Sequence, residues 1–178
     1  MSVLVQAAAL FAKTMHDGQV RKYTGRPYIT HPMRVAGQVT LHKIATDELI
    51  AAAWLHDVVE DCNVSLGNIH DAFGPQVASA VGWLTNPSKG SHLPRAERKE
   101  WDRRHATEAP HYAQVMKLID RLDNLWEIDP ADKFATLYCK ESSLLVDAIG
   151  YADTKLESEI RSRIEWIQQL KTPSGGAT

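Results

Sequence analysis

Apolar residues recur every three to four positions along almost the whole sequence, a spacing typical of amphipathic helices. It predicts helices over residues 3–15, 31–44, 65–74, 75–84, 94–105, 129–149 and 154–170. A further helix begins at Thr46 or Asp47 and carries residues 54–61, and another begins at Pro110. Turn residues separate these segments, and none alternates as a strand does. We therefore predict an all-α fold: one domain of about eight helices over residues 1–171, with a disordered tail at 172–178.

Three segments differ from the rest in composition. Residues 19–30 combine glycine, proline and several cations, which predicts a loop or at most a short hairpin, and residues 86–91 are typical of a mobile loop. The helix over 94–105 is rich in charge, and we expect most of its charged side chains to face solvent.

Composition narrows the range of functions. The chain has 178 residues, a hydrophobic fraction of 44% and a formal net charge of -2. This balance argues against a general nucleic-acid binder, which is usually basic. No apolar run approaches the roughly 20 residues of a membrane span, and no signal peptide is visible. The two cysteines, Cys62 and Cys139, do not form a disulfide framework. We expect a cytoplasmic protein with reduced thiols, no membrane or nucleic-acid partner, and a fold compatible with a homo-oligomer.

The segment Trp54-Leu55-His56-Asp57-Val58-Val59-Glu60-Asp61 places polar chemistry at the end of an apolar helix. Residues four apart share a helix face, so Glu60 is expected over His56 and Asp61 over Asp57. Burying charge without a partner is costly, and a metal ion is the simplest partner for these groups.

A divalent metal needs further ligands, and two residues are the best candidates. His31 stands at the entry to a helix, and Asp120 interrupts an apolar stripe. Two imidazoles and two carboxylates suit Mn, Fe, Co or Zn, and such a set leaves positions open for catalysis. Taken alone, His31 could be a helix-entry residue and Asp120 a buried partner of Arg121. The metal hypothesis rests on all of these residues occurring together on separate predicted helices.

The order His31, His56-Asp57, Asp120 resembles the HD superfamily of metal-dependent phosphohydrolases. Further motifs are similar to the hydrolase domain of RelA/SpoT-type alarmone enzymes, particularly the small stand-alone alarmone hydrolases. These motifs are Arg21-Lys22 before His31-Pro32, then His56-Asp57-Val58-Val59-Glu60-Asp61, and then Lys117-Leu118-Ile119-Asp120-Arg121-Leu122-Asp123-Asn124. The resemblance covers about residues 4–150 and implies a helical HD fold.

The resemblance also implies a reaction and a set of roles. The substrate would be a guanine nucleotide, guanosine tetra- or pentaphosphate, whose 3′-pyrophosphate is removed with Mn2+ to give GDP or GTP and pyrophosphate. Glu60 and Asp61 would be the catalytic acidic pair beside the metal ligands His31, His56, Asp57 and Asp120. The nucleotide would be bound by Arg21 and Lys22, by Asn124 at the ribose, and by Arg95 and Lys140 at the phosphates.

The sequence departs from the family pattern at three places, which leaves the substrate open. Position 119 is Ile where Ala is usual, position 123 is Asp where His or Tyr is common, and residues 125–128 differ from the bifunctional enzymes. One alternative is an HD phosphohydrolase that acts on another nucleotide, such as the 2′-phosphate of NADPH. Another is a catalytically silent module that binds a nucleotide or a partner protein. The silent module is disfavoured because every ligand position and both acidic positions are filled.

Overall fold

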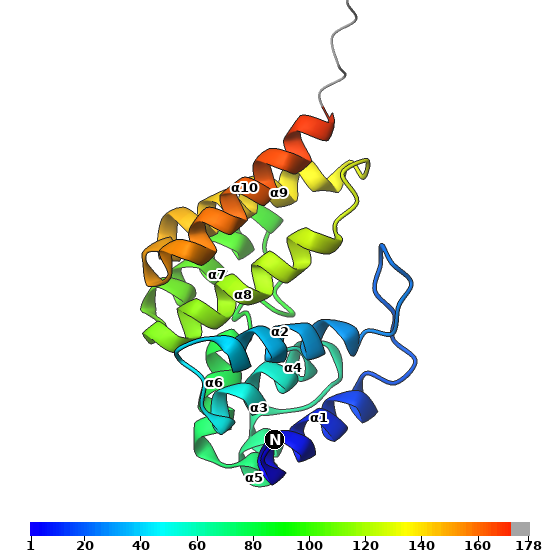
Figure 1. Cartoon of the computed structure of the whole chain (residues 1–178), viewed down its shortest axis with the longest axis vertical. Helices are drawn as coiled ribbons and strands as arrows, with labels where there is room; N and C mark the ends of the chain where they lie inside the picture. The colour runs from blue at the N-terminus through cyan, green and yellow to red at the C-terminus, as the bar shows by residue number, and fades with distance from the viewer. Residues whose placement is uncertain (172–178) are drawn as a thin grey trace, which may run out of the picture.

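The computed structural model describes residues 1–171, and this part of the chain contains ten α-helices (Figure 1). A 3-10 helix, Gly150–Ala152, joins the last two of them. The predicted disordered tail at 172–178 lies outside the described residues. The α-helices are α1 (Val3–Met15), α2 (Thr30–Leu41), α3 (Asp47–Leu55), α4 (Val58–Asp61), α5 (Leu66–Phe73), α6 (Pro75–Leu84), α7 (Arg95–Glu108), α8 (His111–Glu127), α9 (Phe134–Ile149) and α10 (Thr154–Lys171).

The prediction of an all-α fold is confirmed. Residues 1–171 contain no named strand, and their only extended pairing is one antiparallel bridge between Val20 and Pro27, inside the predicted loop. The prediction of one helix through residues 54–61 is wrong, because α3 ends at Leu55 and α4 begins at Val58. This break divides one of the nine predicted segments into two helices, which gives the ten observed against the predicted total of about eight.

Local capping chemistry sets several of the helix starts. Ser2, Thr46 and Ser65 each accept a hydrogen bond from a backbone N–H of the following first turn. Pro75 and Pro110 stand at the starts of α6 and α8, where a missing N–H costs nothing. These starts agree with the sequence-based predictions.

Three predicted boundaries are wrong. The charged helix predicted over 94–105 extends to Glu108. The second helix ends at Leu41 and not at residue 44. The ninth begins at Phe134 and not at residue 129, because the Asp132 carboxylate accepts a hydrogen bond from the Phe134 N–H (2.8 Å) and sets the first turn there.

The helices form two groups that meet along α2, α6 and α8 (Figure 1). In the first group, α3 packs against α1, α2 and α6. In the second, α10 packs against α8 and α9, and α7 packs against α9. Because α2 and α6 both contact α8, side chains from either group can meet at this junction.

Small side chains allow α1 and α3 to pack closely. Ala8 and Ala12 on α1, and Ala51, Ala52 and Ala53 on α3, have no exposed surface. Alanine adds no side-chain bulk beyond one methyl group, so the two backbones can approach each other. This contact fixes the end of α3, where the His-Asp segment begins.

The charged helix α7 is less solvated than the sequence predicts. Asp102 is buried and accepts hydrogen bonds from the Lys99 ammonium (2.9 Å) and the Ser88 backbone N–H (3.3 Å). The pairing offsets the cost of removing the carboxylate from water and ties the 86–91 loop to α7. Within residues 1–171, no helix combines the length and apolar character required to cross a lipid bilayer.

Candidate metal centre and nucleotide pocket

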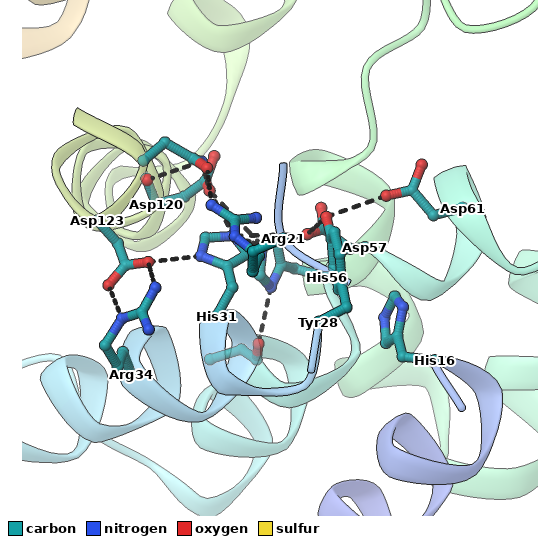
Figure 2. Close-up of polar contacts among 12 residues, drawn as sticks. His16, Arg21, Tyr28, His31, Arg34, His56, Asp57, Asp61, Asp120 and Asp123 are labelled. Atoms are coloured by element: carbon teal, nitrogen blue, oxygen red, sulfur yellow. Dashed lines mark hydrogen bonds and ion pairs between the residues drawn. The ribbon is translucent and has the colours of Figure 1, made fainter. Parts of the chain in front are cut away.

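The four predicted metal ligands come from two helices and from the turn between two others, and they meet at the junction of the two groups (Figure 2). His31 lies in the first turn of α2, and Asp120 lies in the middle of α8. His56 and Asp57 form the turn between α3 and α4, where both keep right-handed helical dihedral angles. The break in the helix therefore presents two adjacent side chains to the same point.

The ligand atoms lie close together. The Nε2 atoms of His31 and His56 are 3.2 Å apart. One carboxylate oxygen of Asp120 lies 3.1 Å from His31 Nε2 and 3.7 Å from His56 Nε2. One oxygen of Asp57 lies 3.2 Å from His56 Nε2 and 3.5 Å from His31 Nε2. The structure thus brings together all four residues that the sequence singles out.

The hydrogen bonds of the two imidazoles show that this donor set fits a cation. The Nδ1–H of His56 donates to the Ala53 carbonyl oxygen (2.8 Å), and the Nδ1–H of His31 donates to the Asp123 carboxylate (2.6 Å). Both rings then present a lone pair at Nε2, and these lone pairs face two carboxylate oxygens. Such a cluster of acceptors requires a positive charge, either protons or a metal ion.

The pKa shifts of these groups also indicate that the cluster requires a positive charge. Burial opposes protonation of His56, but Asp57 and Asp120 outweigh it and raise the pKa of His56 well above its usual value. His31 behaves similarly: burial opposes protonation, yet contacts with Asp120 and Asp123 raise its pKa. Burial likewise opposes ionisation of Asp120, but hydrogen bonds from the two imidazoles lower its carboxyl pKa. The site therefore favours net positive charge at its centre.

Glu60 lies on α4 and faces the 86–91 loop. Its carboxylate accepts a hydrogen bond from the Asn86 backbone N–H (2.6 Å). Burial raises the pKa of Glu60, and the Asn86 N–H and the Lys117 ammonium only partly oppose this shift. Lys117 itself is buried and donates to the Leu84 carbonyl and the Asn86 side chain, both at 2.8 Å. Glu60 is thus a half-buried acid whose pKa is raised above its usual value.

Asp61 is joined to the metal-ligand cluster through Tyr28. The Tyr28 hydroxyl donates to Asp57 (2.7 Å) and lies 3.1 Å from an Asp61 carboxylate oxygen. The other Asp61 oxygen lies 3.2 Å from the Lys89 ammonium. Asp61 therefore lies between the 19–30 loop, which carries Tyr28, and the 86–91 loop.

A pocket of about 310 Å³ lies next to the cluster. Three of the predicted nucleotide-binding residues line it: Arg21, Lys22 and Asn124. Asn124 joins the pocket to the metal ligands, since its side-chain amide donates to Asp120 (2.7 Å) and its oxygen accepts from Arg21 (2.7 Å). The other lining residues are Val20, Tyr23, Tyr28, Glu127, Ile128, Phe134 and Tyr138.

The two predicted phosphate-binding residues, Arg95 and Lys140, lie at different distances from the pocket. The Arg95 guanidinium lies 4.9 Å from the centre of the Phe134 ring and forms two hydrogen bonds with Glu141 (2.7 and 2.9 Å), so it reaches the edge of the pocket. Lys140 is exposed on α9 and is not among the residues that line the pocket. The structure brings Arg95, but not Lys140, to the pocket.

Sequence reasoning missed three charged residues behind the site. Asp123 accepts hydrogen bonds from His31 and Arg34 (Figure 2). Arg34 also donates to Glu127. Helical spacing carries a signal for them: Arg34 follows His31 by one turn on α2, while the polar residues 120, 123, 124 and 127 form one stripe on α8. Read as a stripe, these positions would have marked the face of α8 that is turned toward α2.

Comparison with known proteins places this geometry in a family. A family model described as an HD domain matches residues 8–144. A protein of Danio rerio named guanosine-3′,5′-bis(diphosphate) 3′-pyrophosphohydrolase MESH1 is 38% identical over 121 residues, which cover 67% of this chain and 66% of that protein. The Xenopus tropicalis protein of the same name is 36% identical over 130 residues, or 71% of this chain and 70% of that protein.

A solved structure extends the comparison to the whole fold. It is that of a metazoan ortholog of SpoT that hydrolyzes ppGpp and plays a role in starvation responses. It superposes with a TM-score of 0.82 at 26% identity and covers 93% of this chain and 96% of its own. The chain therefore belongs to the HD domain family, together with the vertebrate guanosine-3′,5′-bis(diphosphate) 3′-pyrophosphohydrolases.

Proposed function

We propose that this chain hydrolyses the 3′-pyrophosphate of guanosine tetra- or pentaphosphate to give GDP or GTP and pyrophosphate, with Mn2+ as the metal. The observation that carries the proposal is the contact of Asn124 with both Asp120 and Arg21. This contact sets a nucleotide-sized pocket directly against a cluster of metal-ligand type. The activities named for the relatives support the choice of substrate.

The pocket has the chemistry to bind a nucleotide. Aromatic side chains on its walls, including Tyr23, Phe134 and Tyr138, offer surfaces on which a base can stack. The Arg21 guanidinium lies 5.2 Å from the centre of the Tyr28 ring and is fixed by its hydrogen bonds. The Lys22 side chain is 67% exposed and is free to exchange its pairing with Asp132 for a phosphate. We propose that Arg95 contacts a distal phosphate and that Lys140 does so by extending its exposed side chain from α9.

In this proposal, His31, His56, Asp57 and Asp120 hold the metal. When bound there, a divalent cation supplies Lewis-acid polarisation of a phosphoryl oxygen and makes water more acidic. Hydrolysis adds the hydroxyl of water to phosphorus, breaks the bond to the ribose 3′-oxygen and returns one proton to that oxygen. Glu60, whose pKa is raised by burial, suits delivery of this proton, and Asp61 suits orientation of the attacking water.

The test is to incubate the Mn2+-loaded protein with ppGpp and to separate the products. GDP and pyrophosphate are expected in equal amounts. His56→Ala and Asp57→Ala should abolish their formation. The chain offers a matched control, because His70 and Asp71 form another His-Asp pair, exposed on α5. His70→Ala and Asp71→Ala should leave the rate unchanged.

Other outcomes would redirect the assignment. Release of phosphate from NADPH without pyrophosphate release from ppGpp would favour a different HD phosphohydrolase. Binding of nucleotide without turnover of either compound would favour a silent binding module. Full activity of His56→Ala would contradict the metal site itself.

A further inference from the structure

The candidate metal centre and the nucleotide pocket are joined by a closed ring of side-chain contacts. One arc runs from Asp120 through Asn124 to Arg21, with both contacts at 2.7 Å. The other arc starts at His31, which lies 3.1 Å from Asp120 and donates to Asp123. Arg34 closes this second arc, because it contacts Asp123 at 2.7 and 2.8 Å and Glu127 at 2.5 Å, and Glu127 in turn contacts Arg21 at 2.5 Å.

Arg34 holds two buried carboxylates at once. The side chains of Asp123 and Glu127 are only 4% and 10% exposed, while that of Arg34 is 30% exposed. Arg34 is neither one of the candidate ligands nor one of the residues that line the pocket. Its planar guanidinium presents several N–H groups in fixed directions, which allows it to bind both carboxylates in one geometry. Without it, both carboxylates would lose a charged donor in a setting that is poorly solvated.

Each carboxylate acts on a different functional side chain. Asp123 accepts the Nδ1–H of His31 and thereby fixes the tautomer that leaves Nε2 free as a ligand. Glu127 accepts the Nε–H of Arg21 and fixes that guanidinium against the Tyr28 ring. The position of Arg34 therefore bears on both sites, although Arg34 belongs to neither.

We propose that Arg34 is a positioning residue shared by the two sites: through Asp123 it sets the affinity for the metal, and through Glu127 it sets the affinity for the nucleotide. The inference rests on the proposed function for the identity of the two ligands. Its distinctive consequence is that a single substitution outside both sites weakens both of them.

The experiment measures two affinities without relying on turnover. Calorimetry gives the dissociation constant of Mn2+ for the metal-free protein and that of GDP for the Mn2+-loaded protein. Arg34→Met keeps the apolar stem and removes the guanidinium, and we expect it to weaken each affinity by roughly tenfold or more, as outer contacts of metal ligands do. Arg34→Lys, which keeps the charge but not the planar fork, should recover part of each loss.

A matched control comes from α10. Arg161 also joins two carboxylates, with hydrogen bonds to Glu157 (3.0 Å) and Asp147 (2.9 Å), but neither it nor its partners are candidate ligands or residues that line the pocket. Arg161→Met should therefore leave both affinities unchanged. Asp123→Asn should weaken Mn2+ binding more than GDP binding, and Glu127→Gln should do the reverse.

Two results would overturn the inference. One is unchanged affinities in Arg34→Met with an unaltered circular dichroism spectrum, and the other is an equal loss in Arg161→Met. If Arg34→Met does not fold, the opposite selectivities of Asp123→Asn and Glu127→Gln decide the question. Absence of pyrophosphate release from ppGpp would overturn the proposed function, whereas the Mn2+ and GDP affinities would still decide the role of Arg34.

Discussion

Removal of divalent metal should destabilise this chain, and the loss should grow as the pH rises from about 6 to about 8. The reason lies in the two Nε2 atoms that face each other at 3.2 Å beside two carboxylates. At low pH, protons can supply the positive charge that this cluster requires. At high pH only a cation can do so, because the metal binds neutral imidazoles.

The sign follows from the shifted pKa values. His31 and His56 have folded-state pKa values above the usual 6.5, so the stability that they contribute to the metal-free protein is present below that pH and is lost as the pH rises through the raised pKa values. The carboxyl pKa values of Asp57 and Asp120 are lowered, so their contribution is present above about 3.8 and is lost in acid. The metal-free protein should therefore lose stability as the pH rises above about 6.5.

The size of the effect can be bounded. A ligand at 100 times its dissociation constant stabilises the folded state by about 2.7 kcal/mol. For a domain of this length, one kcal/mol shifts the midpoint of thermal unfolding by roughly 2–4 °C. Saturating Mn2+ should then raise the midpoint by about 5–11 °C near pH 8, and by clearly less near pH 6.

Differential scanning calorimetry with EDTA or with Mn2+, at both pH values, measures this difference directly. His56→Ala should remove the Mn2+ effect, and His70→Ala, at an exposed histidine, should keep it. An equal midpoint with and without Mn2+ at pH 8 would refute the reasoning, as would a larger Mn2+ effect at pH 6.

Three further predictions concern single side chains. Glu60→Gln should lower kcat by about 100-fold or more while leaving Mn2+ affinity unchanged. It should also remove the alkaline limb of the pH–rate profile, which the raised pKa of Glu60 produces. Full activity with bound metal would exclude a proton-transfer role. Tyr28→Phe removes the hydroxyl that donates to Asp57 and should weaken Mn2+ binding by about tenfold in a calorimetric titration, and an unchanged affinity would show that this contact does not tune the ligand. Leu118→Ala, at a side chain of α8 with no exposed surface, should lower the free energy of unfolding in urea by about 2–5 kcal/mol, so a loss below 1 kcal/mol would contradict the packing described for α8.

The sequence was a good guide where a local signal sets the structure. Thr46 and Ser65 cap helices where helix starts were expected, because a hydroxyl beside the first turn acts over a few residues only. The break after Leu55 was not predicted, because His56 and Asp57 keep helical dihedral angles and nothing in their composition marks a turn. The packing of α3 and the contacts of His56 and Asp57 with residues of other elements determine that break, and both are long-range effects.

The same distinction holds for the site. His31, His56, Asp57 and Asp120 could be chosen in advance because their types and order match a known pattern. Arg34 could not, because its partners lie 89 and 93 residues away and an arginine on a helix is usually solvated. Lys140 shows the opposite problem: matching by spacing alone does not fix the direction in which a side chain on α9 points.

The buried alanines of α3 limit how this sequence can vary in evolution. Ala53 has no exposed surface, and its carbonyl oxygen accepts the Nδ1–H of His56. A larger side chain at Ala53 would push α3 away from the helices packed against it and carry the His56 ring with it, so a change of one or two carbon atoms in the core becomes a displacement at the metal centre. Natural variants should therefore enlarge position 53 only when a side chain packed against α3 becomes smaller.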